Sequence, residues 1–221
     1  MNKIQKLIMK LLCNKKIVAI FLGLSLCFSS VTAVYAQTPY ANAVYSVSLD
    51  IVSYPSGVLT SNNNSETGHS FLVVRNYNSY SIRVGHMSVP AGGTVTVSVF
   101  GNRSAHQGVW YNIEGCYSSG INSSNAIRLT TVLTESKLAT LNNYINNYDY
   151  YDLFDNNCAL FSVRCWNAVS DVDLTGTIPI DLWYSIYGTY DFNTNTSVPS
   201  KTIYDVAYQT SNSIEYDESG A

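Results

Sequence analysis

Cys158 has the local sequence of a reactive thiol. It follows Asp155-Asn156-Asn157, a cluster of good helix N-cap residues, and it opens an apolar segment that predicts a helix to about Val169. A thiol in the first helical turn lies near the positive end of the helix dipole and near unpaired backbone N–H groups, and both lower its pKa. The same N–H groups can bind the oxyanion that forms when a thiolate attacks a carbonyl. Cys158 is therefore a candidate nucleophile.

The neighbouring cysteines are expected to have other roles. Cys165 lies seven residues after Cys158, so their Cα atoms would be ~10 Å apart along a helix. A disulfide requires less than about 7 Å, and these two thiols cannot pair while the helix exists. We interpret Cys165 as a core residue, and the sequence leaves open whether it is bridged to Cys116.

A nucleophilic thiol needs a base, and the sequence offers three histidines, His69, His86 and His106. His69 stands at the head of a largely apolar strand candidate, 70–75, and side chains at strand ends often project into a cleft. Taken alone, each residue also has a purely structural interpretation. A histidine at a strand end is often a surface or core residue, and a cysteine is often a small buried hydrophobe.

Other kinds of catalytic site find no support in the sequence. No histidine belongs to a HExxH arrangement and no cysteines form a CxxC pair, so we expect no zinc site. There is no GxSxG elbow and no glycine-rich phosphate loop. Asp149, Asp152 and Asp155 lack the glycine of an EF-hand loop and are interpreted as a solvated acidic turn. We expect neither a metal nor an organic cofactor.

Two segments together resemble the circularly permuted branch of the NlpC-type papain-like cysteine hydrolase superfamily, which includes lecithin:retinol acyltransferase-like proteins. The segments are GHSFLVV (68–74) and NNCALFS (156–162), in that order. In unpermuted papain-like enzymes the cysteine precedes the histidine, whereas in the permuted branch the histidine opens an early strand. The resemblance covers residues 44–169. It implies a papain-like permuted core in which His69 is the base that activates Cys158.

The resemblance also implies a third polar residue on the strand after that of the catalytic histidine, where it orients the imidazole. His86 matches this position, and its alternative is a side chain that faces solvent. His106 is the second candidate for the third position, or else a contact to substrate. Asn157 is, with His106, a candidate for contacts to the substrate or the oxyanion.

The spacing of apolar residues predicts the elements that would position these side chains, first strands and then helices. Period-two alternation or short apolar runs predict strands at 43–54, 70–75, 80–87, 94–100, 108–114 and 127–131. Strands 70–75 and 80–87 are expected to form a hairpin across the turn 76–79. A helix capped by Thr134 is predicted to run through Asn143 or beyond, followed by the helix of Cys158. With the resemblance, this predicts an α+β fold: an antiparallel sheet packed against a few helices.

The N-terminal 36 residues are interpreted as a secretory signal peptide. The first sixteen contain five lysines and no acidic residue, an apolar run covers 17–28, and Val34-Tyr35-Ala36 resembles a cleavage site. The apolar run is shorter than the about 20 residues that span a bilayer, although an uncleaved anchor is the alternative. We expect one domain over residues 37–208 and a disordered tail over 209–221.

Removing the signal leaves seven Lys and Arg against fifteen Asp and Glu, a net charge of −8. Such an acidic surface argues against nucleic acid and anionic lipid as partners. The resemblance implies a thiol hydrolase that cleaves an amide (in a peptide or a peptidoglycan stem peptide) or a lipid ester. With the signal peptide, we expect a secreted or cell-wall-associated enzyme that is monomeric. The alternatives are a thiol acyltransferase and a secreted, non-catalytic binding module on the same fold.

Overall fold

The computed structural model describes residues 46–55, 68–117, 125–194 and 196–217. All of them belong to one compact unit, Tyr45–Ala221. The signal peptide predicted over residues 1–36 lies outside the described residues.

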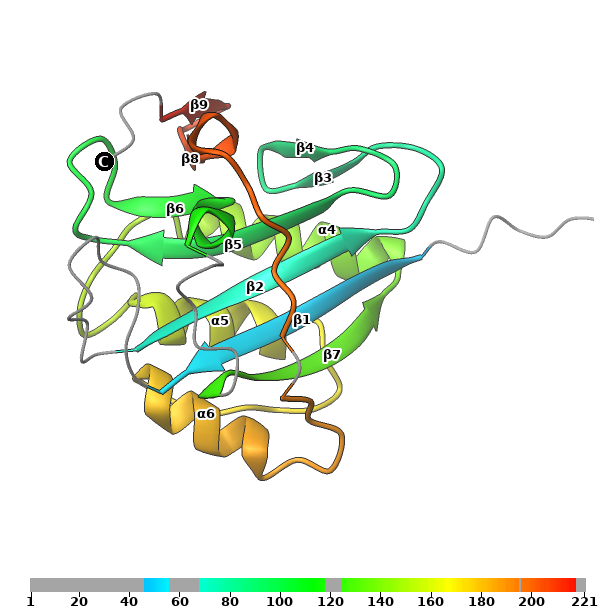
Figure 1. Ribbon diagram of the computed structural model, residues 1–221, viewed down its shortest axis with the longest axis vertical. Helices are drawn as coiled ribbons and strands as arrows, with labels where there is room; N and C mark the ends of the chain where they lie inside the picture. Colours follow the sequence, from blue (N-terminus) through cyan, green and yellow to red (C-terminus); the bar gives the residue numbers. More distant parts are fainter. Residues whose placement is uncertain (1–45, 56–67, 118–124, 195, 218–221) are drawn as a thin grey trace, which may run out of the picture. The chain divides into compact units, whose positions relative to one another are not determined.

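The described residues form a seven-stranded sheet with the strand order β7-β1-β2-β5-β6-β8-β9 (Figure 1). Every neighbouring pair in it is antiparallel. The strands are β1 (Val47–Tyr54), β2 (His69–Asn76), β5 (Thr94–Phe100), β6 (Gly108–Tyr111), β7 (Ile127–Leu133), β8 (Ala207–Gln209) and β9 (Ile214–Tyr216). The predicted α+β class with an antiparallel sheet is therefore confirmed.

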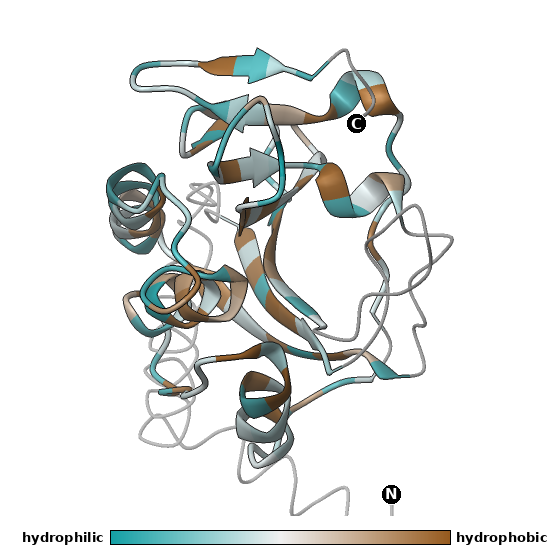
Figure 2. Cartoon of the chain, turned by 90° about the vertical axis from the view of Figure 1, so that its left-hand side faces the viewer, coloured by the Kyte–Doolittle hydropathy of each residue, from teal (hydrophilic) through white to brown (hydrophobic). Residues whose placement is uncertain are grey.

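The helices are α3 (Ile113–Cys116), α4 (Glu135–Asn147), α5 (Cys158–Asn167) and α6 (Pro179–Tyr187), with a 3₁₀ turn, η2, at Ile203–Asp205. Figure 2 shows α4, α5 and α6 together on one side of the sheet, where α5 packs on β2 and β5. The Thr134 cap is confirmed, since its Oγ1 accepts a hydrogen bond from the N–H of Lys137 at 3.2 Å. α6 begins with Pro179, a residue that suits the first turn of a helix.

Both faces of β1 are buried, although its alternating sequence predicts a half-buried strand. Leu49 and Ile51 join the main core between the sheet and the helices. Val52 and Tyr54 join a second, smaller cluster on the opposite face, against which Val198 packs. Figure 1 shows the chain that follows α6, drawn in orange, passing across this opposite face. The late segment thus covers the side that alternation assigns to solvent.

The predicted hairpin of strands 70–75 and 80–87 is wrong. β2 pairs with β1 and β5, whereas β3 (Ile82–Val84) pairs with β4 (Met87–Val89) in a separate two-stranded sheet. Gly85 has φ 56 and allows the tight turn that divides residues 80–87. The Asn76 side chain donates to the carbonyls of Tyr80, at 2.8 Å, and Pro90, at 2.9 Å. These bonds hold together the two ends of the segment that contains β3 and β4.

The expectation of a disordered tail from residue 209 has to be corrected for residues 209–217. β8 pairs with β6, and β9 pairs with β8 at the sheet edge. The Tyr208 hydroxyl donates to Glu215 at 2.5 Å across the last pair. The polar composition of this segment suggests disorder, but the exposed edge of β6 offers it backbone hydrogen bonds.

Candidate active site

Asn157 fixes the start of the helix that begins with Cys158. Its Oδ1 accepts hydrogen bonds from the N–H groups of Ala159, at 3.0 Å, and Leu160, at 3.1 Å. Its Nδ2 donates to two backbone carbonyls at 3.0 and 2.9 Å. The side chain is buried and its polar atoms are engaged in these bonds. Asn157 is therefore an N-cap, and the expectation that its side chain contacts substrate or the oxyanion has no structural support.

The Cys158 thiol lies in an environment that favours the thiolate. Burial alone would raise its pKa. The charge and hydrogen bond of His69, together with the backbone N–H groups of Ser70 and Ala159, outweigh burial and hold the pKa of the thiol below its usual value. Ser70 belongs to β2 and Ala159 to α5, so the strand and the helix that meet here both supply donors. The residue Cys158 as a whole is partly exposed.

His69 joins the thiol to a buried carboxylate. Its Nε2 lies 3.0 Å from Oε1 of Glu114, so Nδ1 is the ring nitrogen left for Cys158. Burial lowers the pKa of His69, but the Cys158 thiolate and the Glu114 carboxylate outweigh it and raise the pKa to about 9. The raised pKa of the histidine and the lowered pKa of the thiol favour an imidazolium–thiolate pair.

Two aromatic rings hold the His69 imidazole in place. Phe71, two residues along β2, stacks on it with centroids 5.6 Å apart and an interplanar angle of 18°. Phe100, at the end of β5, lies with its centroid 4.7 Å from that of His69. Only 7% of His69 is exposed. The ring therefore has little freedom to leave the line between Cys158 and Glu114.

Glu114 reaches this position because the chain turns after β6. The predicted strand 108–114 ends at Tyr111, and Asn112 adopts a left-handed conformation with φ 63 before α3 begins. Asparagine tolerates this region better than most residues, because its short side chain can hydrogen-bond locally. Glu114 is fully buried, and its second oxygen, Oε2, accepts a hydrogen bond from the Thr96 hydroxyl of β5.

Glu114 was not among the predicted site residues, although the sequence contains a signal for it. Between Arg103 and Arg128 it is the one charged residue. A lone carboxylate beside the apolar segment of Trp110 and Tyr111 indicates a buried acid that requires a partner. That partner, His69, lies 45 residues earlier. Nothing in the spacing connects the two.

His86 is not placed to orient His69. It lies in the turn between β3 and β4, and its strand does not pair with β2, which contradicts the premise of the expectation. Its backbone N–H donates to the Tyr111 hydroxyl at 3.2 Å. The Nε2 of His69 is instead engaged by Glu114. The tight turn at Gly85 places His86 between β3 and β4 rather than on a strand beside β2, and Glu114 fills the third position.

His106 forms a separate pair. Its Nε2 lies 2.7 Å from Oδ1 of Asp149, which also accepts the N–H of Val109 at 2.8 Å. The ring stacks on Tyr208, with centroids 5.4 Å apart. This pair ties the loop after β5 to the turn after α4. His106 therefore has a structural role here, and no contact links it to Cys158 in the described residues.

The same turn brings Tyr151 close to the thiol. The Tyr151 N–H donates to the carbonyl of Gln107 at 3.1 Å. Burial and the nearby Cys158 thiolate raise the pKa of the Tyr151 hydroxyl. A Cβ at Gly101 would lie 2.1 Å from the Tyr151 ring, so the loop after β5 packs directly on it. Tyr151 forms one wall of the site and was not among the predicted site residues.

The three described cysteines are all free thiols. Cys165 is fully buried in the core, as predicted, and burial raises the pKa of its thiol. Burial also raises the pKa of Cys116, which is partly exposed. No bridge joins Cys116 to Cys165. Cys158 is the one of the three whose pKa is lowered, so the reactive thiol is distinct from the other two.

Comparison of the chain with family models, curated proteins and solved structures gives no match. In the described ranges, no group of three or more potential metal-ligating side chains comes together. No helix within those same ranges combines the length and the apolar character needed to cross a bilayer.

Proposed function

We propose that this protein is a cysteine hydrolase that breaks an amide or ester bond through a thioester on Cys158. The observation that carries the proposal is the line of three side chains, Cys158, His69 and Glu114, in which the thiol pKa is lowered and the histidine pKa is raised. A binding module has no need for a thiolate, or for a fully buried carboxylate behind the histidine that faces it.

In the first step, the Cys158 thiolate attacks the substrate carbonyl and a carbon–sulfur bond forms. The carbonyl electron pair moves to oxygen, and the backbone N–H of Cys158 donates to the resulting oxyanion. That N–H is outside the pair capped by Asn157, which binds the next two N–H groups of α5. Protonated His69 then gives its proton to the leaving nitrogen or oxygen, the bond to the leaving group breaks, and a thioester remains.

In the second step, water replaces the leaving group. Neutral His69 takes a proton from the water, hydroxide attacks the thioester, and the carbon–sulfur bond breaks to release an acid and the thiolate. Glu114 accepts the Nε2–H of His69 in both steps, which fixes the tautomer and stabilises the imidazolium. The Thr96 hydroxyl holds Glu114 in turn. Glu114 and Thr96 are thus positioning residues for His69.

We also propose a papain-like permuted core, export from the cell and a class of substrate. A strand-opening histidine placed before a helix-opening cysteine, with the helix packed on that strand, supports a papain-like permuted core. The basic and apolar N-terminal segment supports export, which makes a peptide or a peptidoglycan stem peptide the proposed substrate class. Transfer of the acyl group to an amine or alcohol, in place of water, would use the same three side chains.

The proposal is tested by trapping the acyl-enzyme with p-nitrophenyl acetate. We expect a burst of nitrophenol and one acetyl group on Cys158, mapped by mass spectrometry after acid quenching. Cys158→Ser should abolish both. Cys116→Ser is the matched control and should retain both, because Cys116 is a partly exposed thiol whose pKa is raised. A burst that persists in Cys158→Ser, or an acetyl group found on another residue, contradicts the assignment.

A further inference from the structure

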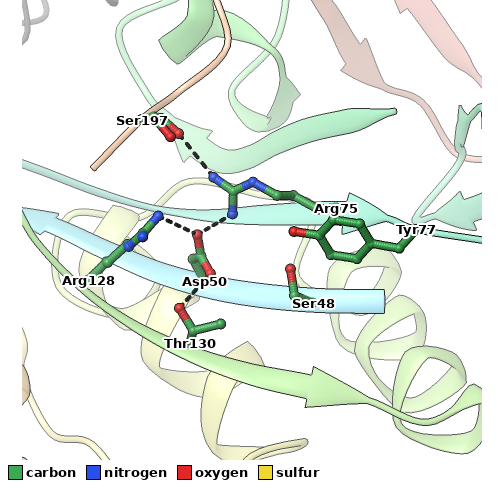
Figure 3. A pocket seen from close by; sticks show the side chains of 7 residues that line it. All are labelled: Ser48, Asp50, Arg75, Tyr77, Arg128, Thr130 and Ser197. Carbon is green, nitrogen blue, oxygen red and sulfur yellow. Dashed lines mark hydrogen bonds and ion pairs between the residues drawn. The ribbon is translucent and has the colours of Figure 1, made fainter. Parts of the chain in front are cut away.

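A polar cavity of about 330 Å³ lies at the other end of β2 from His69, between β7, β1 and β2 (Figure 3). Val47, Leu49 and Ile51 of β1 point into the main core, so Ser48 and Asp50, which alternate with them, point to the opposite face of the sheet. His69 and Arg75 are six residues apart along β2, which corresponds to ~20 Å. The cavity is therefore separate from the thiol site.

Three strands bring two guanidinium groups to one carboxylate in this cavity. Asp50 is 2% exposed at its side chain, and its Oδ2 accepts from Nη1 of Arg75 and lies 3.5 Å from Nη1 of Arg128. Its other oxygen, Oδ1, accepts the Thr130 hydroxyl at 2.8 Å. Figure 3 shows both arginine side chains reaching toward Asp50 from the two strands that flank β1. Among the described lining residues, one positive charge is left uncompensated.

The two arginines differ in how much of their hydrogen-bonding capacity is used. Arg75 also donates through Nη2 to the carbonyl of Ser197, at 3.0 Å, and so holds the segment that crosses this face. Arg128 contacts Asp50 at 3.5 Å only through Nη1, and its buried Nε has no partner among the described residues. Arg75 is therefore sufficient to bind the crossing segment, and this role does not explain Arg128. Arg128 supplies a largely buried charge with donors to spare, which is costly unless an anion is bound.

We propose that this cavity binds a single carboxylate group, carried by a small organic acid or by the C-terminus of a peptide. One excess positive charge matches a monoanion better than a phosphate or sulfate dianion. The planar fork of Arg128 suits the two oxygens of a carboxylate, and the hydroxyls of Ser48 and Tyr77 line the same cavity. The volume lies at the low end for ligand pockets, which suits a small group. This site does not depend on the proposed hydrolase function.

Calorimetric titration of the purified protein with N-acetylglycine and with N-acetylglycinamide tests the proposal, because the two differ only in the carboxylate. We expect the acid to bind and the amide not to bind. Arg128→Gln should weaken binding of the acid at least about tenfold. Arg83→Gln removes the same charge from an exposed position on β3, outside the cavity, and should bind the acid as the wild type does.

A second measurement on the wild-type protein keeps the proposal testable if Arg128→Gln fails to fold. N-acetylglycine should shift the backbone amide resonances of Ser48 and Thr130, and leave those around Cys158 unchanged. Tighter binding of a tripeptide acid than of N-acetylglycine would identify a peptide C-terminus as the source, and equal binding a small acid. The proposal is overturned if the acid and the amide behave alike, if sulfate binds more tightly than acetate, or if the shifts lie elsewhere.

Discussion

The Nε2 of His69 lies 3.0 Å from Oε1 of Glu114, although 45 residues separate the two in the chain. The first residue of β2 and the second residue of α3 meet because the sheet places β2, β5 and β6 side by side. The carboxylate is fully buried, and its charge is one of the causes that raise the pKa of His69 to about 9. This contact makes His69 a stronger proton acceptor for Cys158 than an isolated histidine would be.

Glu114→Gln should reduce kcat/KM for an ester substrate about tenfold to a hundredfold, because an uncharged amide replaces a charge-assisted hydrogen bond. The pKa of His69 should fall at the same time, followed by NMR of the ring protons. Glu215→Gln, at an exposed position on β9, is the matched control and should leave both unchanged. An unchanged pKa of His69 in Glu114→Gln would contradict the role of Glu114 as the partner that raises this pKa.

Substitution of His69 and of His86 by alanine should have very different effects on kcat/KM. His69→Ala should lower kcat/KM by about 10²- to 10⁴-fold, the usual worth of a general base. His86→Ala should stay within about twofold, because His86 lies in the β3–β4 turn and Glu114, not His86, engages the Nε2 of His69. Steady-state hydrolysis of the same ester measures both. A large loss in His86→Ala alone would restore it as the orienting residue and contradict the corrected site.

The pH dependence of kcat/KM should follow the thiol–imidazole pair. The pKa of Cys158 is lowered, so the acid limb should lie below the ordinary thiol value of about 8.5. The pKa of His69 is raised to about 9, so the rate should decline as pH rises through about 9, when the leaving group no longer receives a proton. A single ascending limb near 8.5 with no decline would show an ordinary thiol without an ion-pair partner.

Asn157→Ala should destabilise the protein by about 1–2 kcal/mol, because it removes the cap of α5. It should also slow alkylation of Cys158, since the first turn would no longer hold its N–H groups in place. Chemical denaturation measures the first effect. Asn146→Ala, at an exposed position inside α4, is the control and should change the stability by less than about 0.5 kcal/mol. Equal effects of the two substitutions would contradict the capping role.

Local signals in the sequence were sufficient to predict several strands and helix ends. The alternation over 94–100 corresponds to β5 in full. Thr134 caps α4, as predicted, and Asn157, from the predicted cluster of N-cap residues, caps α5. Cys158 could be placed at the first helical position for the same reason, because an N-cap signal spans only three or four residues. These features depend on neighbours in the chain.

Features that depend on distant neighbours could not be predicted in this way. Strand 70–75 pairs with β1 and β5, and the choice is made by core packing and not by the nearest strand in sequence. Glu114 becomes a site residue only because β6 ends at a left-handed Asn112. β8 exists because the edge of the sheet at β6, about a hundred residues earlier in the chain, accepts it. In each case the partner lies far away in the chain, and a periodicity of two or 3.6 carries no information about it.

The central claim is that His69 and Glu114 activate the thiol of Cys158. Its most direct test is alkylation by limiting iodoacetamide between about pH 5 and pH 9, mapped to each cysteine by mass spectrometry. In the wild type, Cys158 should react first with an apparent pKa well below ~8.5, and that pKa should rise in His69→Ala and in Glu114→Gln. Slow labelling of Cys158 that neither substitution alters would identify an inert cysteine and contradict the proposed function.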